Sequence, residues 1–164
     1  GKTLVIGASY IALETAGFLS AFGNDVTVLV RSILLRGFDQ TIAQRIGDYM
    51  ASHGTKFKYE FSPVSIEENT KNPGTKLVTY KNRKTGESFT EEFDTVIFAI
   101  GRTANTAKLN LDKIGVKVNP KNQKILTNEQ EKSSVEHIFA LGDVADGRPE
   151  LTPPANMAGK LLAK

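Results

Sequence analysis

The chain has no cysteine among its 164 residues. This absence excludes disulfide bonds, thiolate zinc sites and any thiol chemistry carried by the chain itself. Long hydrophobic runs are also missing. The longest, such as Val96 to Gly101 and Ile138 to Leu141, are far shorter than the roughly 20 apolar residues that cross a bilayer. No targeting segment is recognisable at the N-terminus, where the chain begins directly with a strand-like stretch. We therefore expect a soluble protein with no membrane partner.

A strong excess of either charge is missing as well. The chain has 21 Lys and Arg against 18 Asp and Glu, which gives a formal net charge of +3. Because the two signs are interspersed, this balance does not require a nucleic-acid surface, and we expect no nucleic-acid partner. The mild basicity suits an anionic ligand. With 40% apolar residues, the chain has material for one domain and part of a second.

The first 30 residues predict a strand, a helix and a second strand. Lys2 to Ile6 is rich in β-branched residues and predicts a strand, followed by a turn at Gly7 to Ser9. The apolar spacing of Tyr10 to Phe22 is closer to a helix, and Gly23-Asn24 closes it. Asp25 to Val30 is almost continuously apolar, as in a sheet buried on both faces.

The next 70 residues predict a helix, a core strand, an antiparallel meander and a return to the core. Asp39 is a candidate N-cap for a helix through Ser52, with apolar residues every fourth position. The predicted strands are Lys56 to Phe61, Val64 to Glu68, Lys76 to Lys81, Glu87 to Glu91 and Asp94 to Ile100. Polar turns separate the middle three, which indicates a β-meander used as a crossover.

The residues after Gly101 show less regular apolar patterning. Residues 105–134 are mostly polar and predict a linker or a small irregular subdomain. Val135 to Leu141 predicts another strand, Gly142-Asp143 a turn, and Pro153 to Lys164 a helix.

A dinucleotide-binding fingerprint lies between the first strand and the first helix. In Gly7-Ala8-Ser9-Tyr10-Ile11-Ala12, Gly7 permits the tight turn, Ala12 lets helix and strand pack closely, and the helix start presents free amides to a pyrophosphate. Ser9 stands where a second glycine is usual, and its hydroxyl is a candidate phosphate donor. An ordinary strand-helix turn remains the alternative. The predicted fold class is α/β, with a Rossmann-like parallel sheet flanked by helices.

Two arginines follow the second predicted strand, where an NAD site would offer an acid to the ribose 2′-hydroxyl. Arg31, Ser32 and Arg36 suit a 2′-phosphate instead, because Arg clamps phosphate oxygens in bidentate fashion. The predicted cofactor is therefore NADPH, and an NADH-using domain is disfavoured. The alternative is a pair of solvated surface arginines.

Tyr10 and Glu14 lie one helical turn apart and share a face of the first predicted helix. Tyr10 could be a core aromatic. Its place beside the fingerprint favours a role in covering a nicotinamide pocket.

Several motifs together resemble one family. They are Gly7 to Glu14, Arg31 to Asp39, Ala99-Ile100-Gly101-Arg102, Gly142-Asp143 and Glu150-Leu151-Thr152-Pro153. Their order resembles that of the animal-type thioredoxin reductases, and the likeness covers nearly the whole chain. Glutathione reductases are similar but match Ser9 and the region from Arg31 to Arg36 less closely.

The resemblance implies a role for each motif. Gly7, Ala8, Ser9, Tyr10 and Ile11 would hold the pyrophosphate, and Arg31, Ser32 and Arg36 the 2′-phosphate. Tyr10 would be the gate between nicotinamide and flavin, with Glu14 near the nicotinamide. Ile100, Gly101 and Arg102 would line the cofactor. Asp143 would bind the ribityl chain of FAD, and the segment Glu150, Leu151 and Thr152 would open a helix directed at the flavin ring. The implied domains are 1–104, which binds NADPH, and 105–164, a segment of an FAD domain.

The resemblance also implies a longer enzyme, in which hydride passes from NADPH to FAD and then to thioredoxin or a similar disulfide. That enzyme would be a homodimer in the cytoplasm or mitochondria. His53 and His137 do not match the family's catalytic histidine. Because hydride transfer needs a flavin held against the nicotinamide, we expect this chain alone to bind NADPH without turnover, as a monomer. The alternatives are a glutathione or other disulfide reductase, or a non-catalytic NADPH-binding module.

Overall fold

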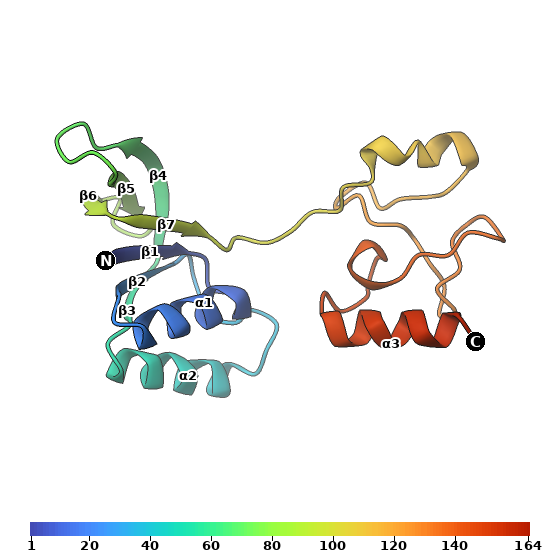
Figure 1. Ribbon diagram of the computed structural model, residues 1–164, viewed down its shortest axis with the longest axis horizontal. Coiled ribbons are helices and arrows are strands. Elements are labelled where there is room, and N and C mark those ends of the chain that lie inside the picture. The colour runs from blue at the N-terminus through green and yellow to red at the C-terminus, as the bar shows by residue number, and fades with distance from the viewer. The chain divides into compact units, whose positions relative to one another are not determined.

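The computed structural model describes all 164 residues. The chain forms two compact units, Gly1–Gly101 and Arg102–Lys164, which carry the blue-to-green and the yellow-to-red segments of Figure 1. None of the helices combines the length and the apolar character that crossing a membrane requires.

A four-stranded parallel sheet organises the first unit. Its strands are β1 (Lys2–Ile6), β2 (Asp25–Val30), β3 (Lys56–Tyr59) and β7 (Thr95–Phe98). They lie in the order β3-β2-β1-β7, and every neighbouring pair is parallel. The sequence therefore predicted the parallel sheet and its Rossmann-like class correctly.

Two helices connect these strands, and each begins at a residue whose side chain caps it. Helix α1 (Tyr10–Ala21) starts after Ser9, whose side chain accepts a hydrogen bond from the amide of Ala12. Helix α2 (Gln40–Ser52) starts after Asp39, whose carboxylate accepts from the amide of Ile42 at 2.9 Å. Both caps satisfy amides that a helix start leaves without partners.

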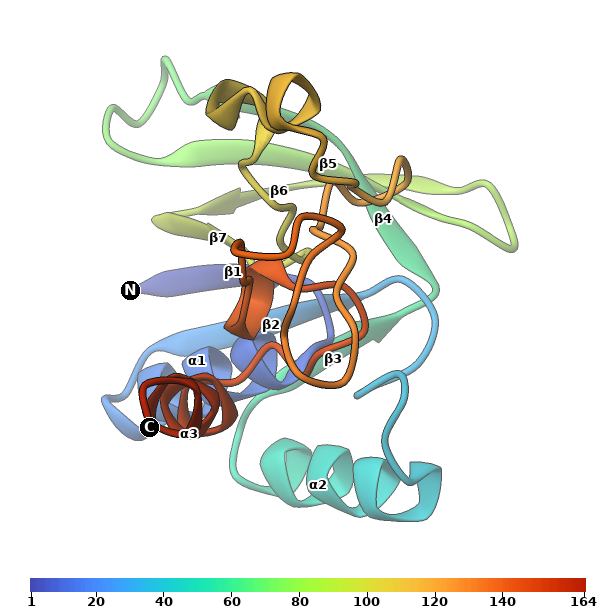
Figure 2. The ribbon, with the colours of Figure 1, turned by 90° about the vertical axis from the view of Figure 1, so that its right-hand side faces the viewer.

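The predicted meander is present as a three-stranded antiparallel sheet. Its strands are β4 (Phe61–Glu68), β5 (Lys76–Asn82) and β6 (Ser88–Phe93). Figure 2 shows the layers of the first unit, with α1 and α2 on one side of the parallel sheet and β4 to β6 on the other.

The parallel sheet is buried on both faces, and β1 shows this residue by residue. Val5 packs among the α1 and α2 side chains. Its neighbours Leu4 and Ile6 pack with Val78, Tyr80 and Phe93 of the meander. Successive side chains of a strand point to opposite faces, so a continuous apolar strand serves both cores.

Two details differ from the sequence prediction. The predicted strand Lys56 to Phe61 is divided, because Glu60 takes a left-handed conformation with φ of 65°, and Phe61 begins β4. In α2 the apolar residues at every fourth position face the core only at the helix end: Ile42 is 53% exposed, Met50 packs against the core, and the buried residues are Ala43 and Gly47. Small side chains on that face let the helix lie close to the sheet.

The second unit has little regular structure. Three single-turn 3₁₀ helices span Ala107–Leu109, Leu111–Ile114 and Gly142–Val144, and helix α3 spans Thr152–Leu162. A small core of Val116, Ile125 and Ala140 holds the loops together. Side-chain hydrogen bonds supplement it: Asp146 accepts from Asn119 and Asn122 at 2.9 and 2.8 Å.

The strand predicted at Val135 to Leu141 is wrong. Only Phe139 pairs with another segment, in an isolated bridge to Lys132. The amide of Ile138 donates to the carbonyl of Val135 at 3.0 Å, which closes a turn inside the apolar run. Periodicity alone does not distinguish such a run from a short buried strand.

A partly buried carboxylate joins the two sheets of the first unit. Glu91 of β6 accepts a hydrogen bond from the Tyr80 hydroxyl and pairs with Lys2 and Lys58, each at 3.1 Å. Partial burial by itself would raise the pKa of Glu91. The hydrogen bonds from Tyr80, Lys2 and Lys58 outweigh that effect and lower the pKa to about 2.

The lowered pKa makes this contact a source of acid sensitivity. The Glu91 contribution to the free energy of unfolding is complete above the unfolded-state pKa of about 4.3 and is lost as the pH falls towards 2. We expect Glu91→Gln to lower that free energy at pH 7 by about 1 to 2 kcal/mol, a value reduced for solvent screening. Urea unfolding at pH 7 and pH 3 measures this. Glu67→Gln, an exposed carboxylate on β4, is the control, and an equal loss in both variants contradicts the assignment.

Candidate functional site

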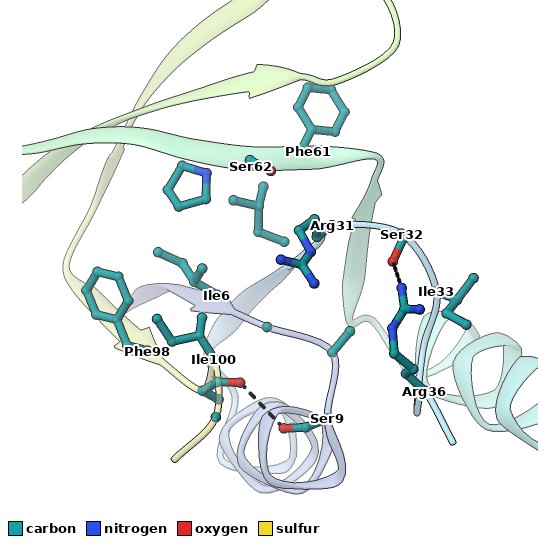
Figure 3. Close-up of a pocket in the computed structure, with 16 residues that line it drawn as sticks. Ile6, Ser9, Arg31, Ser32, Ile33, Arg36, Phe61, Ser62, Phe98 and Ile100 are labelled. Carbon is teal, nitrogen blue, oxygen red and sulfur yellow. Dashed lines mark hydrogen bonds between the residues drawn. The ribbon is translucent and has the colours of Figure 1, made fainter. Parts of the chain in front are cut away.

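A cavity of about 490 Å³ opens at the carboxyl ends of β1, β2 and β7. Its lining includes eight of the residues predicted from the sequence. They are Gly7, Ala8, Ser9, Arg31, Ser32, Arg36, Ile100 and Gly101. Figure 3 shows the labelled members of this group around one space. In parallel sheets flanked by helices, ligands bind at this edge.

The turn between β1 and α1 forms the floor of the cavity and requires glycine at its first position. Gly7 has a φ of 130°, and a Cβ atom built on it would lie 2.2 Å from the carbonyl oxygen of Ala99. That carbonyl follows β7, whose pairing with β1 continues through the Ala99 amide to the carbonyl of Ile6 at 2.8 Å. The absence of a side chain at Gly7 therefore lets the end of β7 close against the turn.

Ser9, the departure from the usual glycine, is used by the protein's own backbone. Its hydroxyl caps α1 at the amide of Ala12, 3.4 Å away, and lies 3.5 Å from the carbonyl of Ala99, as the dashed line in Figure 3 marks. The hydroxyl thus holds the helix start in place. The turn before α1 lines the cavity through Gly7, Ala8 and Ser9.

The two arginines and the serine lie at the other end of the same cavity. Arg31 follows β2 directly, and Figure 3 shows its guanidinium pointing into the space. Arg36 donates a hydrogen bond to the Ser32 hydroxyl at 2.7 Å. Neither guanidinium takes part in a salt bridge with a carboxylate, so both keep their positive charge available for a ligand.

The loop that carries these residues is fastened to the floor of the cavity. The amide of Leu35 donates to the carbonyl of Ala8 at 2.8 Å. The side-chain amide of Gln40 lies within hydrogen-bond distance of the carbonyls of Leu34, Leu35 and Phe38. The sequence analysis missed Gln40, because a side chain that binds only backbone carbonyls leaves no motif.

One wall of the cavity comes from the meander and was also missed. Phe61, Ser62 and Pro63 at the start of β4 line it. Nothing in their own sequence indicates a ligand. Only the fold reveals them. β4 begins just after β3, the strand beside β2, and its first residues therefore lie near the end of β2, where the cavity opens.

Three predicted residues of α1 do not line this cavity. Tyr10 is half-buried and packs against the core between the helices and the sheet. Ile11 is 42% exposed, and Glu14 is exposed one turn further along. The nicotinamide roles of Tyr10 and Glu14 stay predictions.

The remaining five predicted residues lie in the second unit, where the lining of a smaller cavity of about 210 Å³ includes three of them but not Leu151 or Thr152. Arg102, Asp143 and Glu150 line it, and the Arg102 and Asp143 side chains are 4.0 Å apart. Lys124, which the sequence analysis missed, also lines it. Its ammonium lies 2.6 Å from a Glu150 carboxylate oxygen, with its side chain only 10% exposed.

Helix α3 has few backbone N–H groups at its N-terminus. Thr152 is its first residue, and Leu151 precedes it as a cap without a side-chain hydrogen bond. Pro153 and Pro154 follow and have no N–H group. The amide of Ala155 already donates to the carbonyl of Leu151 at 3.2 Å. Among residues 152 to 154, Thr152 alone retains an amide for a ligand.

The sequence of residues 1–159 matches the model of a protein family described as pyridine nucleotide-disulphide oxidoreductase. The match spans both units and every predicted site residue.

The energetic cost of a side chain that clashes with Ala99 can be measured apart from the cost of the positive φ at Gly7. Gly54 also has a positive φ, of 98°, but open space beyond it. We expect Gly54→Ala to lower the free energy of unfolding by about 1 kcal/mol, and Gly7→Ala by about 2 to 4 kcal/mol, because it adds a clash with backbone to the strain. Urea unfolding of both variants measures the difference, and equal losses would show that the close approach does not constrain the turn.

Proposed function

Because the chain belongs to the pyridine nucleotide-disulphide oxidoreductase family, whose members generally use FAD and NAD(P)H, we propose that its first unit is the NADPH-binding domain of a flavin-dependent disulfide reductase. One observation carries this proposal. The turn from Gly7 to Ser9, which leads into a helix and suits a pyrophosphate, lines the cavity. The arginine cluster, which consists of Arg31, Ser32 and Arg36 and suits a 2′-phosphate, lines the same cavity.

The pyrophosphate would lie against the turn from Gly7 to Ser9. This turn places Ala8 and Ser9 in the cavity lining, and α1, 12 residues long, would direct its positive end at the phosphates. The Ser9 cap takes up the amide of Ala12. We assign the pyrophosphate to residues Gly7 to Ile11, of which Gly7, Ala8 and Ser9 line the cavity.

The 2′-phosphate would lie at the arginine end. Arg31 enters the cavity from the end of β2, and Arg36 already shares a hydrogen bond with Ser32. A phosphate there would accept from two guanidinium groups and a hydroxyl without displacing a carboxylate. An acid at the end of β2, which an NAD site would use for the ribose, is absent: the position holds Arg31.

The nicotinamide would extend towards the end of β7, where Phe98 and Ile100 form an apolar rim and are 59% and 71% exposed. The bound cofactor supplies a hydride, and the protein's share of such chemistry is to bind and orient. Tyr10 would cover the nicotinamide, with Glu14 beside it. Gly101 and Arg102 would line its approach.

The second unit would contribute to the FAD site. Asp143 would bind the ribityl chain, and the segment from Glu150 to Thr152 would face the flavin ring. Because Pro153 and Pro154 have no backbone N–H group, α3 would stabilise an anionic flavin mainly through its dipole. Thr152 would add a single N–H donor. We propose the boundary between the NADPH domain and the FAD segment at residue 104, three residues after the first compact unit ends at Gly101.

The proposed enzyme is of the thioredoxin reductase type, a homodimer of the cytoplasm or mitochondria that reduces thioredoxin or a similar disulfide. The motif order and the arginine cluster support this type over a glutathione reductase. A chain that binds NADPH without catalysis is the alternative. The motifs Gly142-Asp143 and Glu150 to Pro153 speak against it, since they have no evident use as motifs without flavin.

The arginine cluster gives the test of cofactor choice. We expect the chain to bind NADPH more tightly than NADH in calorimetric titrations at one fixed ionic strength. Replacing both Arg31 and Arg36 with Ala should weaken NADPH binding by several kcal/mol, at about 1.5 to 3 for each hydrogen bond to a charged group, and leave NADH binding nearly unchanged.

Arg45→Ala is the matched control, because Arg45 is an exposed arginine on α2 outside the cavity lining. Equal losses for NADPH and NADH in the double variant would contradict the 2′-phosphate assignment. If the unmodified chain shows no preference for NADPH, the proposed cofactor is wrong.

A further inference from the structure

A third arginine, far away in the sequence, touches the arginine cluster. Arg83 lies in the hairpin between β5 and β6, and its guanidinium donates a hydrogen bond to the backbone carbonyl of Arg31 at 3.2 Å. The contact joins the meander to the residue at which β2 becomes the loop of the candidate cofactor site.

The sheet register explains why this contact forms. Val30 at the end of β2 pairs with Tyr59 at the end of β3. Glu60 therefore lies beside Arg31, and its left-handed conformation turns the chain into β4. The amide of Arg83 donates to the carbonyl of Glu60 at 2.7 Å, which brings the Arg83 side chain within reach of Arg31.

The hairpin that carries Arg83 is well fixed. The Asn82 side chain accepts hydrogen bonds from the amides of Lys84 and Thr85 at 2.9 and 3.0 Å. The Asn82 amide donates to the carbonyl of Glu87 at 2.8 Å. Arg83 is thus anchored by its own amide and by a closed turn, although its side chain is exposed.

On the side of the meander, Arg83 is the side chain that donates a hydrogen bond to the backbone of the arginine cluster. Leu35 and Gln40 fix the later part of the loop, from Leu34 to Phe38. Arg83 fixes its first residue, whose side chain enters the cavity. Its positive charge also adds to the field at this end of the cavity.

We propose that Arg83 is a positioning residue for cofactor selection, which holds the backbone of Arg31 so that the Arg31 guanidinium meets the 2′-phosphate. This step rests on the proposed binding of NADPH. It assigns a role in selecting 2′-phosphorylated nucleotides to the meander, which carries no part of the dinucleotide fingerprint.

The test compares adenosine 2′,5′-bisphosphate, NADPH and NADH in calorimetric titrations of the 164-residue chain. We expect Arg83→Ala to weaken the two 2′-phosphorylated ligands about five- to tenfold and NADH less than about twofold. Arg83→Lys, which keeps a charged donor, should recover part of the loss. Lys81→Ala removes a nearby charge on β5 and should change neither ligand class by more than about twofold.

A second comparison separates positioning from charge alone. In a chain that already has Arg31→Ala, adding Arg83→Ala should cause no further loss of NADPH binding, because the residue being positioned is gone. A persisting loss, an equal loss for NADH, or an equal effect of Lys81→Ala overturns the role of Arg83. Circular dichroism melting confirms that each variant folds.

The outcome for the unmodified chain keeps the two proposals apart. If that chain prefers NADPH but Arg83→Ala behaves as the parent does, the inference about Arg83 fails while the proposed function stands. If the unmodified chain shows no such preference, the proposed function fails, and the role of Arg83 fails with it.

Discussion

Burial of the parallel sheet on both faces is the constraint on which the first unit depends. Helices cover one face and the meander the other, so β1 and β2 are almost wholly apolar and must lie in the middle. This arrangement brings the ends of β1, β2 and β7 to one edge. The turn from Gly7 to Ser9, the loop that carries Arg31 and Arg36, and the rim of Phe98 and Ile100 then line one cavity.

The parts of this site that could be predicted are those with a local signal. A glycine turn between a strand and a helix, and arginines directly after the next strand, are visible in short stretches of sequence. Their meeting follows from the rule that parallel strands end at the same edge. The same reasoning gave the α/β class, the cap at Asp39 and the antiparallel meander, whereas the cap at Ser9 was not predicted.

The parts that could not be predicted depend on contacts between distant segments. Arg83 and the start of β4 belong to the site only because Glu60 turns the chain back beside β2. Gln40 acts through backbone carbonyls, and Lys124 through an ion pair with Glu150. The apolar run at Val135 misled the periodicity argument, because the second unit has no sheet for such a run to join.

The two prolines at the start of α3 have a consequence for whatever binds in front of that helix. Hydrogen bonds from amides are directional and would fix a partner's rotation as well as its charge. With N–H groups missing at Pro153 and Pro154, most of what remains is the broad electrostatic potential of the helix end. Such a potential favours negative charge but does not fix position or tilt, so the orientation of a bound group must be set by other residues around it.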